Sequence, residues 1–198
     1  MKRIAIFASG NGSNAQRIAE YFTGNNAVEV AMILSNRQDA FVLKRANRLG
    51  IPARVFDRSS FYKTDEVLEW LVEAKIDLIV LAGFLWLVPS NLVAAYPNRI
   101  LNIHPALLPG YGGKGMYGDI VHKAVIDAGE TESGITIHFV DEKYDHGNII
   151  FQATCKIEAG DTPEKLAHKV HQLEHKHYPK VIEHVLYDRI SFLKHHHD

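Results

Sequence analysis

The sequence predicts an α/β protein built on a doubly wound, mostly parallel sheet, with antiparallel strands in its C-terminal part. Short β-branched runs alternate with helical patterns through the first two-thirds of the chain, as they do in βαβ units. The run Leu78–Leu81 is apolar throughout, which is typical of a strand covered on both faces. After Pro105 the pattern changes, and alternating strands are expected at Ile135–Val140 and Asn148–Lys156.

The remaining elements follow in chain order. Strands are predicted at Arg3–Ala8, Val28–Leu34, Ala53–Phe56, Leu78–Leu81 and Ile100–Ile103. Helices are predicted at Asn14–Phe22, Ala40–Leu49, Lys63–Glu73, Ser90–Ala95 and Ile120–Asp127. Asp145-His146-Gly147 is expected to form a hairpin or bulged loop. A final helix, capped by Asp161-Thr162, is expected from Pro163 to Tyr187 with an interruption at Pro179.

Length and composition indicate an ordinary globular protein. The 198 residues fit one domain, predicted over 1–188, with a tail at 189–198 whose His195-His196-His197 is either part of a tag or native. The chain is 46% apolar and 23% charged, which excludes a disordered or fibrous chain. The net charge is −1 with both signs interspersed, so neither nucleic acid nor a membrane is an expected partner.

The cytoplasm is the expected compartment. Cys155 is the single cysteine, so no internal disulfide can form. The N-terminus enters a strand-like run without a signal-peptide pattern. The longest apolar run, Leu78 to Val88, is shorter than the ~18 residues of a membrane span.

A glycine-rich turn follows the first strand. In Gly10-Asn11-Gly12-Ser13-Asn14, backbone N–H groups and the dipole of the next helix converge, which favours a phosphate. The alternative is a simple capped turn with Ser13 or Asn14 as the cap.

The same turn also fits a relaxed dinucleotide fingerprint, Gly10-x-Gly12-x-x-Ala15. The second strand ends without the acidic residue that would hold a ribose 2′-hydroxyl, whereas Arg37 could suit a 2′-phosphate. An NADP-dependent oxidoreductase and a non-catalytic nucleotide-binding module therefore stay open as alternatives.

Asn102 and His104 are two residues apart on an extended segment, so their side chains point to the same side of the sheet. Pro105 reinforces the extended geometry of His104. An amide donor and a group that titrates near neutrality thus stand together at a strand's carboxyl end, where ligands bind in open α/β sheets. For an isolated His, the alternative is a hydrogen-bonded structural role.

The run from His104 to Pro109, His-Pro-Ala-Leu-Leu-Pro, preceded by Asn102, resembles the signature of the folate-dependent formyltransferases. The turn Gly10–Asn14 resembles the phosphate loop of the branch that formylates glycinamide ribonucleotide. Other matching segments run in family order over almost the whole chain: Ala82–Phe84, Gly134–Val140, Asp145–Gly147, Gly160–Thr162 and Glu174-His175. The resemblance implies a Rossmann-like formyltransferase fold.

The resemblance also implies the reaction, in which N10-formyltetrahydrofolate gives its formyl group to the amine of glycinamide ribonucleotide without a metal. Asn102 would hold the negative charge that develops on the formyl oxygen, an effect worth roughly 3–4 kcal/mol for one donor in other enzymes. His104 would stabilise the same oxygen or shuttle the proton. Asp145 would orient His104. His138 is expected either at the edge of the core or as a partner of Asp145.

Binding residues carry over from the family in the same way. The phosphate contacts fall on Gly12, Ser13 and Asn14, and the anchor of the substrate end falls on Glu174. The expected folate pocket uses Arg58 at the glutamate tail, the lid Asp141–Asp145 over the pteridine, and the backbone and apolar surface of Leu85, Trp86, Leu87 and Val88. Ala106, Gly110 and Trp86 depart from the family pattern, and the last two remove positive charge from the folate side.

Two further expectations concern metal and relatives within the family. His168, His171 and His175 share one helix face, but no cluster completes a metal site, so a structural or solvated role is expected.

The chain is too short for the additional domain of the formyltetrahydrofolate hydrolases or of the methionyl-tRNA formyltransferases. Hydrolysis of formyltetrahydrofolate stays open as an alternative activity, and the chain could form a homodimer.

Overall fold

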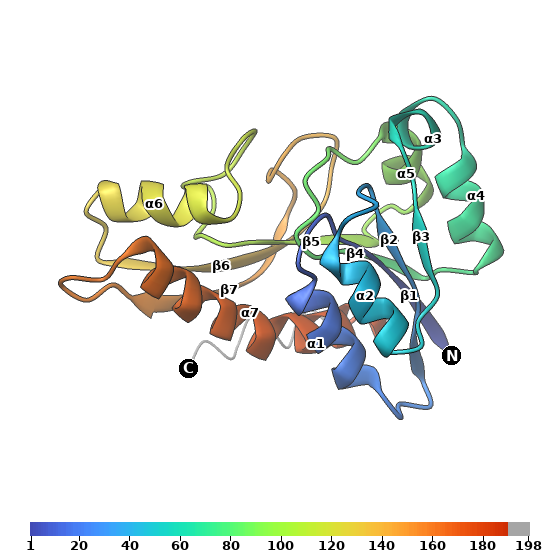
Figure 1. The fold of residues 1–198 in the computed structure, drawn as a ribbon, viewed down its shortest axis with the longest axis horizontal. Coiled ribbons are helices and arrows are strands. Elements are labelled where there is room, and N and C mark those ends of the chain that lie inside the picture. The colour runs from blue at the N-terminus through green and yellow to red at the C-terminus, as the bar shows by residue number, and fades with distance from the viewer. Residues whose placement is uncertain (190–198) are drawn as a thin grey trace. The chain divides into compact units, whose positions relative to one another are not determined.

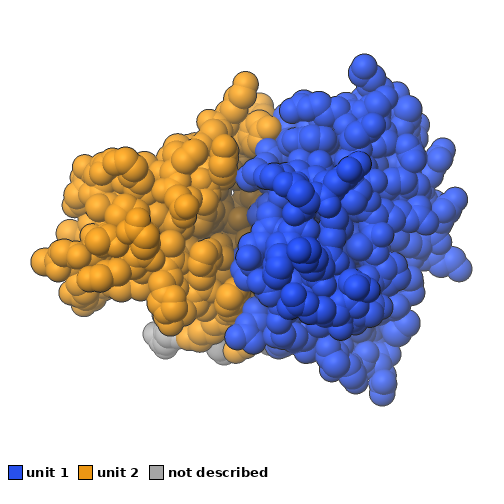
Figure 2. All heavy atoms as spheres, in the orientation of Figure 1, with its two compact units in different colours: residues 1–101 blue, residues 102–198 orange. Residues whose placement is uncertain are grey.

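The computed structural model describes residues 1–189. Apart from Arg189, the tail predicted at 189–198, including His195–His197, lies outside the described residues. The chain forms two compact units, Met1–Leu101 and the residues from Asn102 on (Figure 2). Each unit carries its own part of the sequence motifs. The boundary falls inside the strand Ile100–His104.

The first unit is a parallel α/β structure (Figure 1). Its elements in chain order are β1 (Lys2–Phe7), α1 (Ser13–Phe22), β2 (Val28–Ser35), α2 (Phe41–Arg48), β3 (Ala53–Val55), α3 (Arg58–Tyr62), α4 (Glu66–Glu73), β4 (Leu78–Leu81), α5 (Ser90–Ala95) and the beginning of β5 (Ile100–His104). The first four strands lie in the order β3-β2-β1-β4. β1 pairs in parallel with β2 and β4, and β2 pairs in parallel with β3.

The apolar strands explain this arrangement. Ile4, Ile6, Leu78 and Val80 are fully buried, as the continuous apolar runs of β1 and β4 require in a parallel sheet. α1 and α2 pack against β2 and against each other. The chain winds from β1 out to β3 and then returns to the other side of β1. This reversal is where open α/β sheets bind ligands.

The second unit is antiparallel. It contains the rest of β5, α6 (Asp119–Asp127), β6 (Glu132–Phe139), β7 (Ile149–Lys156) and α7 (Pro163–Leu186). β6 and β7 pair antiparallel from Glu132 opposite Lys156 to His138 opposite Ile149, with an irregularity at Ile137/His138. α7 packs on α6, β6 and β7. The predicted antiparallel strands are thereby confirmed, and Asp145-His146-Gly147 lies in the connection between them, as expected for a hairpin.

α7 differs from the prediction at Pro179. The helix begins as expected, because Thr162 caps it by accepting the N–H of Lys165. It then continues through Pro179 to Leu186 without interruption. An internal proline costs about 3 kcal/mol. Here Tyr178, Pro179 and Ile182 are all buried, and this apolar burial offsets the lost hydrogen bond.

Other boundaries differ where local polar contacts decide them. The helix predicted at Lys63–Glu73 begins later, at Glu66, as α4, and a short helix that was not predicted, α3, precedes it at Arg58–Tyr62. Asp57 and Ser60 form a capping box at the start of α3, whereas no side-chain hydrogen bond from the N-cap residue Asp65 caps α4. β6 begins at Glu132 instead of Ile135, because the ladder to β7 includes the polar residues before Ile135.

Gly134, in β6, has no room for a side chain. A Cβ there would lie 2.0 Å from the carbonyl oxygen of Ala153 and 2.9 Å from Leu107 Cδ2. Gly134→Ala is therefore expected to lower the free energy of unfolding by roughly 1–3 kcal/mol, the usual cost of overpacking. Chemical denaturation measures this. Gly10→Ala, where a Cβ meets nothing within 4 Å, is the matched control, and equal stability of both variants would contradict the packing described.

Candidate active site

The carboxylate of Asp145 is the centre of a polar cluster in the second unit. Its Oδ2 lies 3.5 Å from Nδ1 of His104 and accepts the Gly113 N–H at 3.0 Å. Its Oδ1 accepts a hydrogen bond of 3.3 Å from Nδ2 of Asn102. Nε2 of His138 lies 3.7 Å from the same oxygen. The structure thus brings four of the predicted residues, Asn102, His104, His138 and Asp145, to one point.

Local geometry explains this convergence. Asn102 and His104 lie on β5, two positions apart, so both side chains leave the strand on one side. Asp145 stands in the loop after β6 with a φ of 51°, and Tyr111, in the loop after β5, has a φ of 54°. Left-handed backbone at a residue other than glycine costs about 1–3 kcal/mol and is concentrated at functional sites.

The hydrogen bonds assign roles to the ring nitrogens. Nε2 of His104 lies 2.7 Å from the carbonyl oxygen of Tyr111, to which only an N–H can donate. Nδ1, which faces Asp145, is therefore the atom of His104 that gains or loses a proton. In His138, Nδ1 donates to the carbonyl of Phe139 at 2.8 Å, and Nε2 accepts from Nδ2 of Asn102 at 3.1 Å.

Burial and charge act on these groups in opposite directions. His104 is 3% exposed, and burial lowers its pKa from 6.5, more than the charge of Asp145 and the carbonyl of Tyr111 raise it. Burial raises the pKa of Asp145. The nearby ring of His138, the charge of His104 and the Gly113 N–H together outweigh burial and bring this pKa below 3.8.

The protonation states follow from these directions. His104 is neutral at pH 7 and Asp145 is ionised. Because the folded-state pKa of Asp145 is below its ordinary value, its ionised form stabilises the fold above that value. This stabilisation is lost as the pH falls through the folded-state pKa.

Several groups that hold the cluster were missed by the sequence analysis. Thr136 is fully buried. Its hydroxyl donates to the carbonyl of Ala106 at 2.7 Å and accepts the N–H of Leu108 at 2.9 Å. Gln152 donates to the carbonyl of Leu108 at 3.0 Å and to the Thr136 hydroxyl at 2.9 Å. β6 and β7 therefore fix the segment that follows His104.

The glycine-rich turn lies at the start of α1 in the first unit. Gly12 is the N-cap residue, with a φ of 77°, and no side-chain hydrogen bond caps this helix in the described chain. The capped turn with Ser13 or Asn14 as the cap is therefore wrong. Gly12 is also required by packing, because a Cβ there would lie 2.4 Å from Val42 Cγ2. The first-turn amides of Ser13 and Asn14 follow this glycine.

Ser9 joins three strand ends beside this turn. Its hydroxyl donates to Oδ1 of Asn36, which follows β2, at 2.7 Å and accepts the N–H of Leu85, which follows β4, at 3.0 Å. Arg37 makes two hydrogen bonds to Asp39, at 3.1 and 2.9 Å. The cation that an NADP site would need is therefore paired with a neighbouring carboxylate.

Two of the residues predicted for the folate pocket in the first unit, Arg58 and Trp86, lie in an aromatic cluster. The guanidinium of Arg58 lies 4.8 Å from the centre of the Trp86 ring, and Tyr62 packs on Trp86 at 5.9 Å. The Tyr62 hydroxyl donates to the carbonyl of Leu87 at 2.9 Å. Leu85 is 41% exposed, whereas Val88 is buried.

Two predicted residues of the second unit lie outside the Asp145 cluster. Asp141 accepts a hydrogen bond from His146 at 2.7 Å and does not bond to Asp145. Glu174 is buried on α7, and its Oε2 is 4.0 Å from Nε2 of His171.

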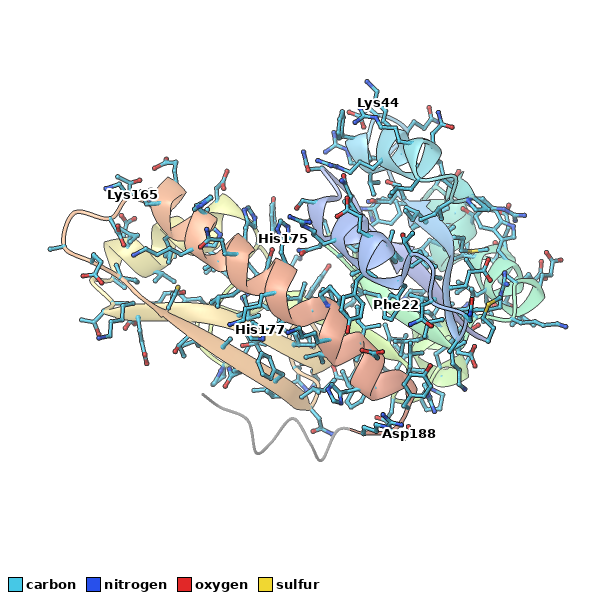
Figure 3. The ribbon with its side chains drawn as sticks, turned by 90° about the horizontal axis from the view of Figure 1, so that it is seen from below. Phe22, Lys44, Lys165, His175, His177 and Asp188 are labelled. Atoms are coloured by element: carbon cyan, nitrogen blue, oxygen red, sulfur yellow. The ribbon has the colours of Figure 1, made fainter. Side chains whose placement is uncertain are left out.

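The histidines predicted to share a face of α7 contact other side chains of the second unit. The rings of His171 and His175 stack at 6.4 Å, and Nε2 of His168 lies 3.1 Å from the Gln172 amide. His175 and His177 project from opposite sides of the helix (Figure 3), and His177 packs on Phe151. Among residues 1–189, no group of three or more His, Cys, Asp or Glu could hold a metal ion. In the same range no helix is long and apolar enough to cross a membrane.

Comparisons with known proteins agree on one family. A family model described as formyl transferase matches residues 2–182. The phosphoribosylglycinamide formyltransferase of Bacillus subtilis is 37% identical over 191 residues, which cover 94% of this chain and 95% of that protein. The chloroplastic phosphoribosylglycinamide formyltransferase of Arabidopsis thaliana is 43% identical over 197 residues, covering 96% of this chain and 68% of that protein.

A solved structure confirms the predicted fold class. The phosphoribosylglycinamide formyltransferase of Anaplasma phagocytophilum matches with a TM-score of 0.86 at 33% identity, covering 94% of this chain and 87% of that chain. The oxidoreductase and hydrolase alternatives find no support in these matches.

The charge of Asp145 is the largest of the effects that raise the pKa of His104 against burial. Asp145→Asn is expected to lower the pKa of His104 further, because burial then acts against a weaker opposing interaction. NMR titration of the His104 ring protons measures this pKa. Asp141→Asn removes a carboxylate that is bonded to His146 instead and should leave the pKa of His104 unchanged. An unchanged or raised pKa of His104 in Asp145→Asn would contradict the electrostatics described.

Proposed function

The chain belongs to the formyl transferase family, and from that premise we propose that it carries the formyl group of N10-formyltetrahydrofolate to the amine of 5-phosphoribosylglycinamide, a step of purine biosynthesis. One observation carries the proposal. The family match over residues 2–182 includes the whole Asp145 cluster and the glycine-rich turn. Relatives with this activity in their names are 37% and 43% identical to the chain over almost its full length.

The reaction needs charge stabilisation and one net proton transfer. The amine nitrogen forms a bond to the formyl carbon, and the electron pair of the carbonyl moves onto oxygen. When that pair returns, the bond from carbon to N10 of the folate breaks. The amine nitrogen loses one proton and N10 gains one. An α-amino group has a pKa of about 7.7–8.0, so only about a tenth to a fifth is neutral at pH 7.

Asn102 is proposed to hold the charge on the formyl oxygen. Its Nδ2 carries two hydrogens, which point to His138 at 3.1 Å and to Asp145 at 3.3 Å. The longer bond is the one that a formyl oxygen would replace. His138, whose Nδ1 is bonded to the Phe139 carbonyl, would keep the amide in the same orientation.

His104 is proposed to move the proton. Its Nε2 is bonded to the Tyr111 carbonyl, so Nδ1 accepts the proton of the attacking amine and releases it toward the leaving nitrogen. The neutral free form of His104 suits this role. Asp145, 3.5 Å from Nδ1, stabilises the imidazolium while it exists.

The binding residues follow from the same proposal. Gly12, Ser13 and Asn14 would bind the substrate phosphate through backbone amides at the start of α1, and Glu174 would anchor the ribose or amine end. The folate would contact Arg58, the segment Leu85-Trp86-Leu87-Val88, and the loop from Asp141 to Asp145. Trp86, already beside Arg58, would offer a ring for stacking where the family often has a cation.

The remaining assignments are also proposals. Residues 1–188 would act as one formyltransferase domain, since the family match runs through both compact units. No metal, nucleic acid or membrane would take part. Cys155 is a free thiol, in keeping with the cytoplasm. The chain is also proposed to form a homodimer, and sedimentation equilibrium of the purified protein, which measures its mass in solution, tests this.

Purified protein mixed with 5-phosphoribosylglycinamide and N10-formyltetrahydrofolate is expected to release tetrahydrofolate in proportion to formylated product, with excess EDTA present. Asn102→Ala should lower kcat by about 10²–10³-fold, the usual cost of one oxyanion donor. His104→Ala should lower kcat by about 10²–10⁴-fold. Circular dichroism checks that each variant is folded.

His168→Ala is the control, because this histidine is exposed on α7, and it should keep the full rate. Near-normal rates in both Asn102→Ala and His104→Ala would remove these residues from the chemistry. Release of formate without formylated product would indicate hydrolysis instead.

A further inference from the structure

Arg45 is bonded to the glycine-rich turn, Gly10–Asn14, and the mechanism above does not use it. It lies in the last turn of α2 and is half-buried. Its Nε donates to the carbonyl oxygen of Asn11 at 2.8 Å, and its Nη2 donates to the side-chain Oδ1 of the same residue at 2.7 Å. One guanidinium therefore holds both the backbone and the side chain of Asn11.

The guanidinium is itself fixed on its other sides. Its Nη1 donates to Oε1 of Gln16 in α1, and Gln16 in turn donates to Glu20 at 2.6 Å. The guanidinium carbon lies 5.0 Å from the centre of the Phe41 ring. Because all three nitrogens have acceptors and one face stacks on Phe41, the guanidinium has little rotational freedom.

Other groups of α2 shape the same turn. The N–H of Val42 donates to the carbonyl of Gly10 at 3.1 Å, and the Val42 side chain occupies the space that a Cβ on Gly12 would need. Groups of α2 therefore fix the shape of the glycine-rich turn, and among them Arg45 supplies the charged contact.

The bond to the Asn11 carbonyl has a consequence for Gly12. A peptide unit is planar and trans, so the carbonyl of Asn11 and the N–H of Gly12 point in opposite directions. When Arg45 fixes that carbonyl, it also fixes the direction of the Gly12 N–H, away from the guanidinium. If this N–H contacts the substrate phosphate, its direction is decided by Arg45.

We propose that Arg45 is the positioning residue of the phosphate site: it orients the Gly12 N–H through the Asn11 carbonyl and adds a fixed positive charge beside the turn. This inference rests on the proposed function for the role of Gly12, Ser13 and Asn14. It predicts that Arg45 acts on the binding of 5-phosphoribosylglycinamide and has little effect on the formyl donor or on the chemical step.

Arg45→Met keeps the length and packing of the stem and removes the three donors. The KM for 5-phosphoribosylglycinamide should rise about tenfold or more, as expected when a charged hydrogen-bond donor is lost. The KM for N10-formyltetrahydrofolate and kcat should each change less than twofold. Arg45→Lys keeps the charge without the fork of donors. Its KM for 5-phosphoribosylglycinamide should therefore lie between those of the wild-type protein and Arg45→Met.

Arg48→Met is the matched control. Arg48 lies on the same helix and 5.5 Å from the same Phe41 ring, so its loss tests the effect of charge and stacking alone. It should leave both KM values unchanged. Equal rises for Arg45→Met and Arg48→Met, an unchanged KM for 5-phosphoribosylglycinamide in Arg45→Met, or a rise shared by both substrates would overturn the proposal.

A measurement that does not need turnover separates this proposal from the proposed function. In ¹⁵N NMR, inorganic phosphate titrated into the wild-type protein should shift the amide of Gly12, and Arg45→Met should need about tenfold more phosphate for the same shift. If wild-type protein forms no formylated product, the proposed function fails, and this titration still tests Arg45. The same phosphate dependence in both proteins would overturn its positioning role.

If Arg45→Met does not fold, Arg45→Lys and Asn11→Ala take its place in both measurements. Asn11→Ala removes the bond to Oδ1 and keeps the bond to the carbonyl. Its effect should therefore be smaller than that of Arg45→Lys, and the reverse order would contradict the argument from the peptide plane.

Discussion

The polar cluster of the second unit is arranged around the largely buried carboxylate of Asp145, which must stay ionised. The side chain of Asp145 is 11% exposed, and desolvation alone would favour its neutral form. The surrounding groups reverse that preference: the Gly113 N–H, the Asn102 amide and the two imidazoles of His104 and His138. The charge of Asp145 also raises the pKa of His104 against burial. The arrangement of the cluster and the proposed proton transfer therefore depend on the same balance between burial and charge.

Much of the second unit serves to keep these groups in place. Thr136 and Gln152 tie the segment after His104 to β6 and β7. Tyr111, in left-handed backbone, presents its carbonyl to His104, and this bond decides which ring nitrogen exchanges protons. In the first unit, a comparable dependence links α2 to the glycine-rich turn, because Arg45 holds Asn11 by two hydrogen bonds. Both units thus use hydrogen bonds to backbone groups to orient the atoms that are proposed to meet a ligand.

The strands and the pair Asn102 and His104 were predictable, because apolar runs and a spacing of two residues depend only on local geometry. The resemblance to formyltransferases supplied Asp145, which no pattern near β5 indicates. Thr136 and Gln152 resemble ordinary strand residues in the sequence, and their role appears only when β6 and β7 pair. The Tyr111 carbonyl and Gly113 N–H are backbone groups, which carry no sequence signal. Arg45 and Asn11 are 34 residues apart. The helix through Pro179 shows tertiary burial overriding a local rule.

Asn102 and His104 are proposed to act on one transition state beside Asp145, and a double-mutant cycle would reveal whether they do. The rates of Asn102→Ala, His104→Ala and the double variant would be measured at saturating substrates. Residues that act as a unit are strongly non-additive. We expect the rate of the double variant to be within about threefold of that of the slower single variant. Losses that multiply in full would show that the two side chains act independently, and a shared transition state would then be ruled out.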